Sequence, residues 1–186
     1  MVEAAKSAPY LGDSVSARPL NEVQLRGVEI GVHRGSHAAE ILKSLPMVEL
    51  VLVDPWRAYS TDGKMYNDQQ FQDSAYSHVL SSLANDPRVR IIRERSSDAS
   101  SRFSDAYFDF AYIDGDHSYE AVSQDLRLWW PKVRFRGVLA GDDYKPKFPG
   151  VMQAVTEFAV RQEIPLQALS GGQFVLHRTR AEPFVR

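Results

Sequence analysis

Short apolar runs that alternate with amphipathic stretches constrain the fold of this chain most strongly. Five such runs are rich in Val, Ile, Leu and Phe and end at turn residues, which is typical of buried strands. They cover residues 27–32, 48–53, 89–92, 108–113 and 137–141. Because these runs are apolar on both faces, they predict a parallel sheet covered by helices on each side.

The stretches between these runs have the spacing of helices. Apolar residues recur every three or four positions in 36–45, 118–130 and 151–160, and 71–84 also has helical character. Strands that alternate with helices in this way predict an α/β domain. The segment 93–105 is polar and irregular, and we interpret it as a loop.

Two strand-like runs near the end of the chain break this alternation. They cover residues 165–169 and 173–178, and the Ser170-Gly171-Gly172 segment between them is typical of a hairpin rather than a crossover. The last strand should therefore run antiparallel, at or near the edge of the sheet.

Composition narrows the possible functions. The 186 residues suit one domain, which we place at 26–179, between a loose N-terminal arm at 1–25 and a tail at 180–186. A net charge of −2 without a basic block gives no reason to expect nucleic acid. The absence of cysteine excludes disulfides, thiolate metal sites and a cysteine nucleophile. No apolar run approaches the ~18 residues that span a bilayer, so we expect a soluble, cytoplasmic protein with no membrane partner.

A long connection follows the second predicted strand. Residues 54–70 show neither a strand nor a helix pattern and precede the helical segment 71–84. A connection of this length over the carboxyl end of a sheet is often a lid or substrate loop, and the alternative is a surface excursion.

The turn after the first predicted strand has features of a ligand-binding loop. Gly31 and Gly35 lie in this turn, where glycine lets the backbone approach a ligand, and Ser36 is a candidate N-cap for the next helix. A glycine pair in such a turn can equally serve the turn alone.

Asp54 ends the second predicted strand and strengthens the ligand interpretation. A carboxylate at this place can accept both ribose hydroxyls of an adenosine that lies across the strand ends, although an Asp here is often only a helix cap. Pro55 and Trp56 follow and offer a rigid turn and a flat apolar surface for a ring.

The loop does not have the glycine spacing of a dinucleotide site. His33 stands where a middle glycine would be, and the acidic Glu29 lies at the end of the strand. A carboxylate beside the loop disfavours a pyrophosphate and suits a cationic or zwitterionic ligand. This pattern favours a sulfonium amino acid over NAD.

Carboxylates also follow two later strands. Asp114 ends the fourth predicted strand, and Asp142 and Asp143 end the fifth. Adjacent strands lie ~4.8 Å apart, so these side chains should converge, and like charges raise one another's pKa unless a cation neutralises them. An all-oxygen cluster suits a hard divalent ion such as Mg²⁺. The alternative is that they are separately solvated turn and cap residues, which we favour for Asp116.

Four separated segments carry a resemblance to a known family. VEIGVHRGSHA, VLVDPW, FAYIDGDHSYEAVSQDL and GVLAGDDY resemble class I S-adenosylmethionine-dependent methyltransferases. They are most similar to the metal-dependent O-methyltransferase branch, which includes catechol O-methyltransferase and macrolide sugar O-methyltransferases. The resemblance covers about residues 26 to 179. It implies a Rossmann-like seven-stranded sheet of order 3-2-1-4-5-7-6 with strand 7 antiparallel. The family's middle glycine is replaced here by His33.

The resemblance also implies roles for individual residues. It places the three metal ligands on Asp114, Asp142 and Asp143, and it suggests His117 as the general base. It puts Ser97 and Asp98 near the adenine. The full set of expected S-adenosylmethionine contacts is Glu29, Gly31, His33, Gly35, Ser36, Asp54, Trp56, Ser97, Asp98 and Asp114.

The expected reaction is methyl transfer to a hydroxyl of a small diol, sugar or catechol-like acceptor, assisted by Mg²⁺ or a similar cation. Two other functions stay open: a non-catalytic protein that binds S-adenosylmethionine, and a metal-dependent hydrolase that uses the carboxylate cluster. A homodimer is a further possibility.

Overall fold

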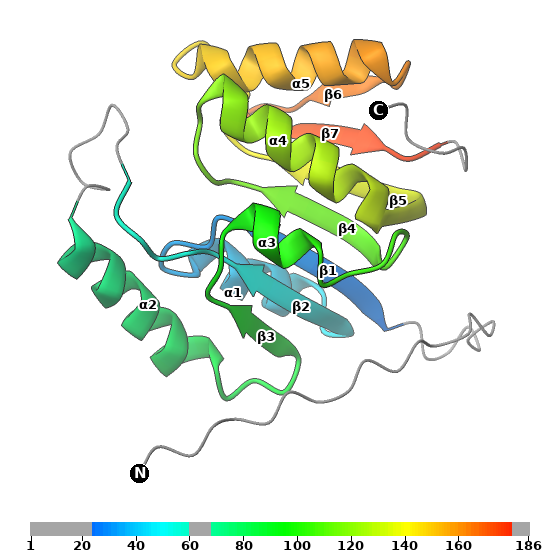
Figure 1. The fold of residues 1–186 in the computed structure, drawn as a ribbon. Helices are drawn as coiled ribbons and strands as arrows, with labels where there is room; N and C mark the ends of the chain where they lie inside the picture. The colour runs from blue at the N-terminus through cyan, green and yellow to red at the C-terminus, as the bar shows by residue number, and fades with distance from the viewer. Residues whose placement is uncertain (1–23, 60–67, 180–186) are drawn as a thin grey trace.

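The computed structural model of the chain describes residues 24–59 and 68–179. Seven strands form one sheet in the order β3-β2-β1-β4-β5-β7-β6, with helices on both faces (Figure 1). This order confirms the fold that the resemblance implied. Residues 1–23 of the proposed arm, the proposed tail, and residues 60–67 of the proposed lid lie outside the described residues. The proposed boundary of the arm at residue 25 was wrong, because Leu25 is the first residue of the first strand.

The strands follow the apolar runs of the sequence. β1 to β5 pair in parallel, and β7 runs antiparallel to both β5 and β6, as the terminal hairpin pattern predicts. β5 begins four residues before the predicted run. The strands are β1 (Leu25–Ile30), β2 (Val48–Val53), β3 (Val89–Ile92), β4 (Phe108–Ile113), β5 (Val133–Gly141), β6 (Leu166–Ala168) and β7 (Phe174–His177).

Two of the described helices begin where a local side chain can satisfy a free N–H group of the first turn. The Asp68 carboxylate accepts a hydrogen bond from the Gln70 amide, and the Ser118 hydroxyl accepts one from the Ala121 amide. The helices are α1 (Ser36–Ser44), α2 (Gln69–Leu83), α3 (Ser96–Ser100), α4 (Tyr119–Trp129) and α5 (Pro149–Arg161), and a 3₁₀ turn, η2 (Trp130–Lys132), follows α4. The loop predicted at 93–105 was wrong in part, because α3 lies within it.

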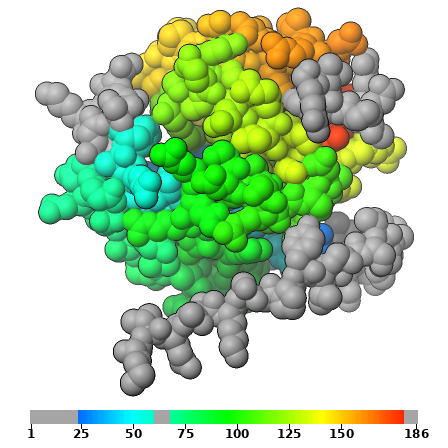
Figure 2. Space-filling view, in the orientation of Figure 1, coloured from blue at the N-terminus to red at the C-terminus, as the bar shows by residue number. Residues whose placement is uncertain are grey.

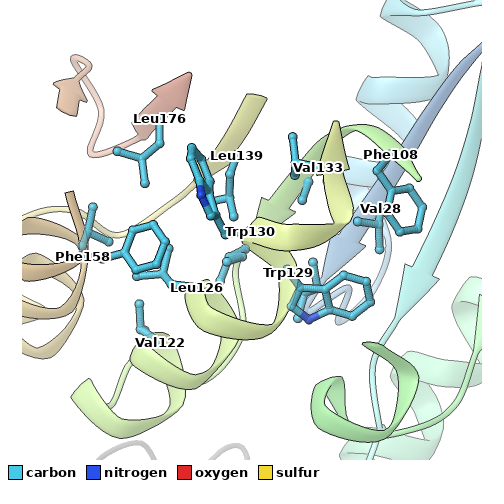
Figure 3. Packing of buried hydrophobic residues seen from close by; sticks show 14 of the residues in the cluster. Val28, Phe108, Val122, Leu126, Trp129, Trp130, Val133, Leu139, Phe158 and Leu176 are labelled. Atoms are coloured by element: carbon cyan, nitrogen blue, oxygen red, sulfur yellow. The ribbon is translucent and has the colours of Figure 1, made fainter. Parts of the chain in front are cut away.

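Two hydrophobic layers cover the sheet. Successive residues of β2 point to opposite faces, so Leu50 and Leu52 pack with α1 and α2, whereas Val51 and Val53 pack with the layer under α3, α4 and α5. Figure 3 shows the second layer, in which Trp129 lies beside Phe108. Both layers leave the carboxyl ends of the parallel strands open for a ligand.

None of the helices within residues 24–59 and 68–179 combines the length and the apolar character that crossing a bilayer requires.

Candidate active site

A cavity of about 680 Å³ lies over the carboxyl ends of the parallel strands. Its walls come from the β1–α1 loop, the segment after β2, α3, the turn after β4 with the first turns of α4, and the end of β5. In Figure 2 the surface is hollowed between the cyan segment that follows β2 and the green surface of α3 and α4. Ligands of open α/β sheets bind at this edge.

The β1–α1 loop passes very close to the end of β4. Gly31 has φ +86°, and a Cβ atom at this position would clash with the carbonyl group of Asp114. His33, which replaces the family's middle glycine, also has a positive φ of 50°. A residue with a side chain rarely adopts this conformation without support from its surroundings. At His33 the loop therefore has the left-handed backbone conformation that a glycine would adopt.

Asp54 supplies part of that support. Its Oδ2 accepts hydrogen bonds from the amides of Val32 (2.9 Å) and His33 (3.0 Å), and its Oδ1 accepts one from the amide of Trp56 (2.7 Å). Burial raises the pKa of Asp54, and these three hydrogen bonds act in the opposite direction. Asp54 lines the cavity, and it also ties the β1–α1 loop to the end of β2.

Trp56 does not lie where a ligand could stack on it. Its side chain is fully buried, its ring packs against Tyr76, and its indole N–H donates a hydrogen bond to the His33 carbonyl (2.8 Å). The predicted flat surface for a cofactor ring is therefore not present at this residue. The large apolar ring is more stable in the layer beneath α1 and α2 than in an open cavity.

A buried glutamate and a partly exposed histidine form an acid–base pair that lines the cavity. Glu29 is 1% exposed, and its Oε1 lies 3.2 Å from His37 Nδ1. Among the described residues, none forms a hydrogen bond with the buried Oε2. Burial raises the pKa of Glu29, while the hydrogen bond to Glu29 raises the pKa of His37. A cationic group on a ligand would satisfy the open oxygen.

Asp114, His117 and Asp143 form the centre of the acidic cluster. One possible ligand atom from each lies within 4.8 Å of the others. His117 Nε2 is 2.8 Å from Asp143 Oδ2, and Lys145 Nζ forms an ion pair with Asp143 Oδ1. Burial, followed by the nearby Asp142 and Asp143, raises the pKa of Asp114 to about 7. The donor set of oxygens and one imidazole fits a divalent cation.

Asp142 has a different position from the one expected of a third ligand. Its Oδ1 accepts a hydrogen bond from the amide of Asp143 (2.6 Å), and it lines the cavity without joining the group of three. The sequence therefore predicted convergence of the carboxylates, whereas the structure places His117 closer to Asp114 and Asp143.

The other predicted residues divide into two groups. Ser36 and Ser97 line the cavity, whereas Gly35 and Asp98 do not. Gly35, with a φ of +77°, is the N-cap residue of α1, and no side chain caps this helix, so the prediction of Ser36 as the N-cap was wrong. Asp116 Oδ1 accepts a hydrogen bond from the Ser118 amide (2.8 Å), a turn contact just before α4.

Asp125 is among the cavity residues that sequence reasoning missed. It is buried on the inner face of α4, next to Leu126 and one turn after Val122. A charged residue among the apolar positions of a helix was the signal that could have identified it.

The sheet order matches the fold of class I S-adenosylmethionine-dependent methyltransferases, and the cavity lies at the strand edge where ligands of such sheets bind. A family model described as a methyltransferase domain matches residues 28–144, which is more than half of the chain. The chain belongs to this methyltransferase domain family. A comparison with curated protein sequences finds no match.

Several solved structures share the fold. The O-methyltransferase NovP is 20% identical with a TM-score of 0.67, over 86% of this chain and 74% of that one. CalS11, a TDP-rhamnose 3′-O-methyltransferase of calicheamicin biosynthesis, is 20% identical with a TM-score of 0.53, over 83% and 72%. MycE of the mycinamycin pathway, solved with Mg and SAH, is 17% identical with a TM-score of 0.56, over 86% and 46%.

Proposed function

We propose that this protein is an O-methyltransferase that uses S-adenosylmethionine and a divalent cation to methylate a hydroxyl of a small diol, sugar or catechol-like acceptor. One observation supports the proposal most strongly: the candidate cofactor loop and the candidate metal ligands line the same cavity. The β1–α1 loop with Glu29 and Asp54 forms one part of its wall, and the cluster of Asp114, His117 and Asp143 forms another.

The residues near β1 and β2 suit the cofactor. Glu29 Oε2 is a buried acceptor without a partner among the described residues, which matches the α-ammonium group of a sulfonium amino acid. Asp54 lines the wall where a ribose would cross the strand ends, and its Oδ1, which accepts one hydrogen bond from the Trp56 amide, can accept a further one. Gly31, His33 and Ser36 bring backbone and the start of α1 to the same ligand.

Asp114 and Asp143 are the carboxylates best placed to hold the cation, with Asp142 as the third ligand that the resemblance implies. A bound divalent cation would supply Lewis acidity, and S-adenosylmethionine would supply an activated methyl group. The raised pKa of Asp114 shows that the cluster is unfavourable for negative charge by itself, which supports a cation at this place.

His117 is the candidate general base. In the reaction the acceptor oxygen takes the methyl group from the sulfonium, which leaves as S-adenosylhomocysteine, and the hydroxyl proton passes to His117 Nδ1. His117 Nε2 lies 2.8 Å from Asp143 Oδ2, so its N–H can donate to that carboxylate, which stabilises the imidazolium. Because attacking and leaving atoms must align, positioning of the two substrates by the cavity should supply much of the rate acceleration.

Calorimetric titration of S-adenosylmethionine, with and without Mg²⁺, tests the proposal. We expect wild-type binding in the micromolar range and loss of that binding in Asp54→Ala. Asp105→Asn, which changes an exposed carboxylate paired with Lys132, is the control and should bind as the wild type does. Failure of the wild-type protein to bind under either condition would overturn the methyltransferase function and would favour a metal-dependent hydrolase.

A further inference from the structure

Asp125 is a buried carboxylate in the cavity wall that the proposed reaction does not use. It lies on α4, is 6% exposed and lines the cavity together with Ser96, Ser97 and Gly115. Burial raises its pKa to about 6, while the hydrogen bond from Ser96 acts in the opposite direction. A carboxylate in such surroundings is costly unless both of its oxygens find donors.

One of the two oxygens is held by a directed chain of hydrogen bonds. The Trp129 indole N–H donates to Ser96 Oγ (2.7 Å), and the Ser96 hydroxyl donates to Asp125 Oδ1. Because an indole nitrogen can only donate, the Ser96 proton points toward Asp125. Trp129 is fully buried beside Phe108 in the core (Figure 3), so the chain starts from a fixed point.

The other oxygen faces open space. Among the described residues, none donates a hydrogen bond to Asp125 Oδ2. A Cβ atom built on Gly115 would lie 3.8 Å from Oδ2 and would meet no other heavy atom within 4 Å. The missing side chain at Gly115 therefore leaves room for a ligand group directly in front of this acceptor.

This part of the cavity is where the base of the cofactor would lie. The acidic cluster is at the ends of β4 and β5, and Asp54 is at the end of β2, whereas Asp125 stands beside α3, which follows β3. A ligand with its sulfonium near the cluster and its ribose near Asp54 extends its base toward α3 and α4.

We propose that Asp125 Oδ2 accepts a hydrogen bond from the exocyclic amine of adenine and so selects an adenine base. The inference rests on the proposed function. That amine is the only N–H donor of an adenine linked through N9, and an ionised carboxylate can only accept. A base with a carbonyl in place of the amine would bring two acceptors together.

The wild-type protein alone provides the first test. Calorimetry compares S-adenosylhomocysteine with S-inosylhomocysteine, in which a carbonyl oxygen replaces the exocyclic amine. We expect the adenosyl compound to bind more tightly, by a factor on the order of tenfold to a hundredfold. Equal affinities would overturn the role of Asp125 and leave the proposed function intact. Failure of both compounds to bind would overturn the proposed function, and this inference with it.

Asp125→Asn gives a sharper test because the Ser96 hydroxyl fixes the orientation of the new amide. The amide oxygen must accept from Ser96, which places the NH₂ group where Oδ2 was. We expect this variant to bind S-adenosylhomocysteine about tenfold more weakly and to gain affinity for S-inosylhomocysteine, so that the preference falls or reverses. A purely structural loss would weaken both compounds equally.

The matched control is Glu120→Gln, the same change at an exposed position of α4 outside the cavity. It should keep the wild-type preference. Retention of the wild-type preference by Asp125→Asn would overturn the inference, and the wild-type comparison decides the question even if that variant does not fold.

Discussion

At the residue scale, Asp143 shows which positively charged and hydrogen-bonding groups offset the negative charge of the acidic cluster. One oxygen pairs with Lys145 and the other with His117, so two nitrogen groups occupy the carboxylate that we assign to the metal. Asp143 also has a φ of 62°, an uncommon conformation for a residue with a side chain. A cation must therefore compete with the Lys145 ammonium for Asp143.

Lys145→Met should tighten Mg²⁺ binding severalfold, because the substitution removes a positive charge that both repels the cation and occupies its ligand. Calorimetric titration of the protein with MgCl₂ measures this change. Lys147→Met is the control, since Lys147 is exposed and its ammonium lies over the Phe148 ring rather than on a carboxylate. Weaker Mg²⁺ binding in Lys145→Met would show that Lys145 supports the site instead of competing with it.

His117→Gln separates two roles for the imidazole, general base and metal ligand. If His117 is the base, methyl transfer should fall by roughly 10²- to 10⁴-fold while Mg²⁺ affinity stays within a few fold of the wild type. Asp114→Asn is the comparison and should lose Mg²⁺ binding. A large loss of Mg²⁺ affinity in His117→Gln would identify the imidazole as a ligand and would leave the base unassigned.

Some positions of site residues could be predicted from the sequence, and others could not. The convergence of Asp114 and Asp143 followed from their places at the ends of adjacent strands. The burial of Trp56 and the cavity position of Asp125 did not, because both depend on which face of an element is covered by α2 or α3. Such coverage is a tertiary property that local spacing does not encode.

At the element scale, the β1–α1 loop and the end of β4 share one constraint, which is the absence of a side chain at Gly31. A methyl group there would meet the backbone carbonyl of Asp114, and backbone cannot rotate away as a side chain can. The position of the β1–α1 loop, which we assign to the cofactor, and the position of Asp114, which we assign to the metal, therefore depend on the same contact.

Gly31→Ala should destabilise the protein by about 3 kcal/mol, because it adds both the strain of φ +86° and this clash. S-adenosylmethionine affinity should fall as well. Chemical denaturation and calorimetry measure the two effects. Gly171→Ala is a matched control: its φ is +103°, but its Cβ would meet first the amide group of the Gln173 side chain at 3.0 Å. Equal costs at both positions would show that strain alone matters and that the contact with β4 does not.

Sequence patterns predicted the long elements and missed the short one. β2, β3 and β4 have the bounds of their apolar runs, whereas β1 begins and ends two residues before its run at 27–32. α1, α4 and α5 match their apolar periodicity. α3 has five residues, four of them Ser or Asp, so it has no apolar stripe and is stabilised by contacts with α4. Its position nevertheless decides where Ser96 and Ser97 face the cavity.

At the scale of the whole molecule, buried carboxylates make stability depend on pH. The pKa of Asp114 is raised to about 7 and that of Asp125 to about 6, against about 3.8 for an unperturbed Asp. Between these values the folded protein holds more protons than the unfolded chain. The free energy of unfolding contributed by these groups therefore falls as pH rises from about 4 to about 7.

Asp114→Asn should flatten this dependence. In metal-free buffer we expect the wild-type Tm to fall relative to that of the variant as pH rises from 5 to 8, by on the order of 5 °C. Addition of Mg²⁺ at pH 8 should raise the wild-type Tm and leave the variant nearly unchanged. A difference between wild type and variant that stays constant across this pH range would contradict the raised pKa of Asp114.

The fold of the whole molecule was the most predictable level. Apolar strands, amphipathic helices and a terminal hairpin indicated an α/β sheet, and the resemblance of four segments supplied the strand order. The cavity itself was not predictable in shape, since it is formed by side chains from five different connections.

Transfer of a labelled methyl group from S-adenosylmethionine to a panel of small diols, sugars and catechols, with Mg²⁺ or with a chelator, tests metal-dependent O-methylation by this protein. We expect methylated product with Mg²⁺, little product with the chelator, and little in Asp143→Asn under either condition. Equal turnover with and without the chelator would contradict the assignment of the carboxylate cluster to a metal. Binding of S-adenosylmethionine without product from any hydroxyl acceptor would contradict O-methylation of this acceptor class.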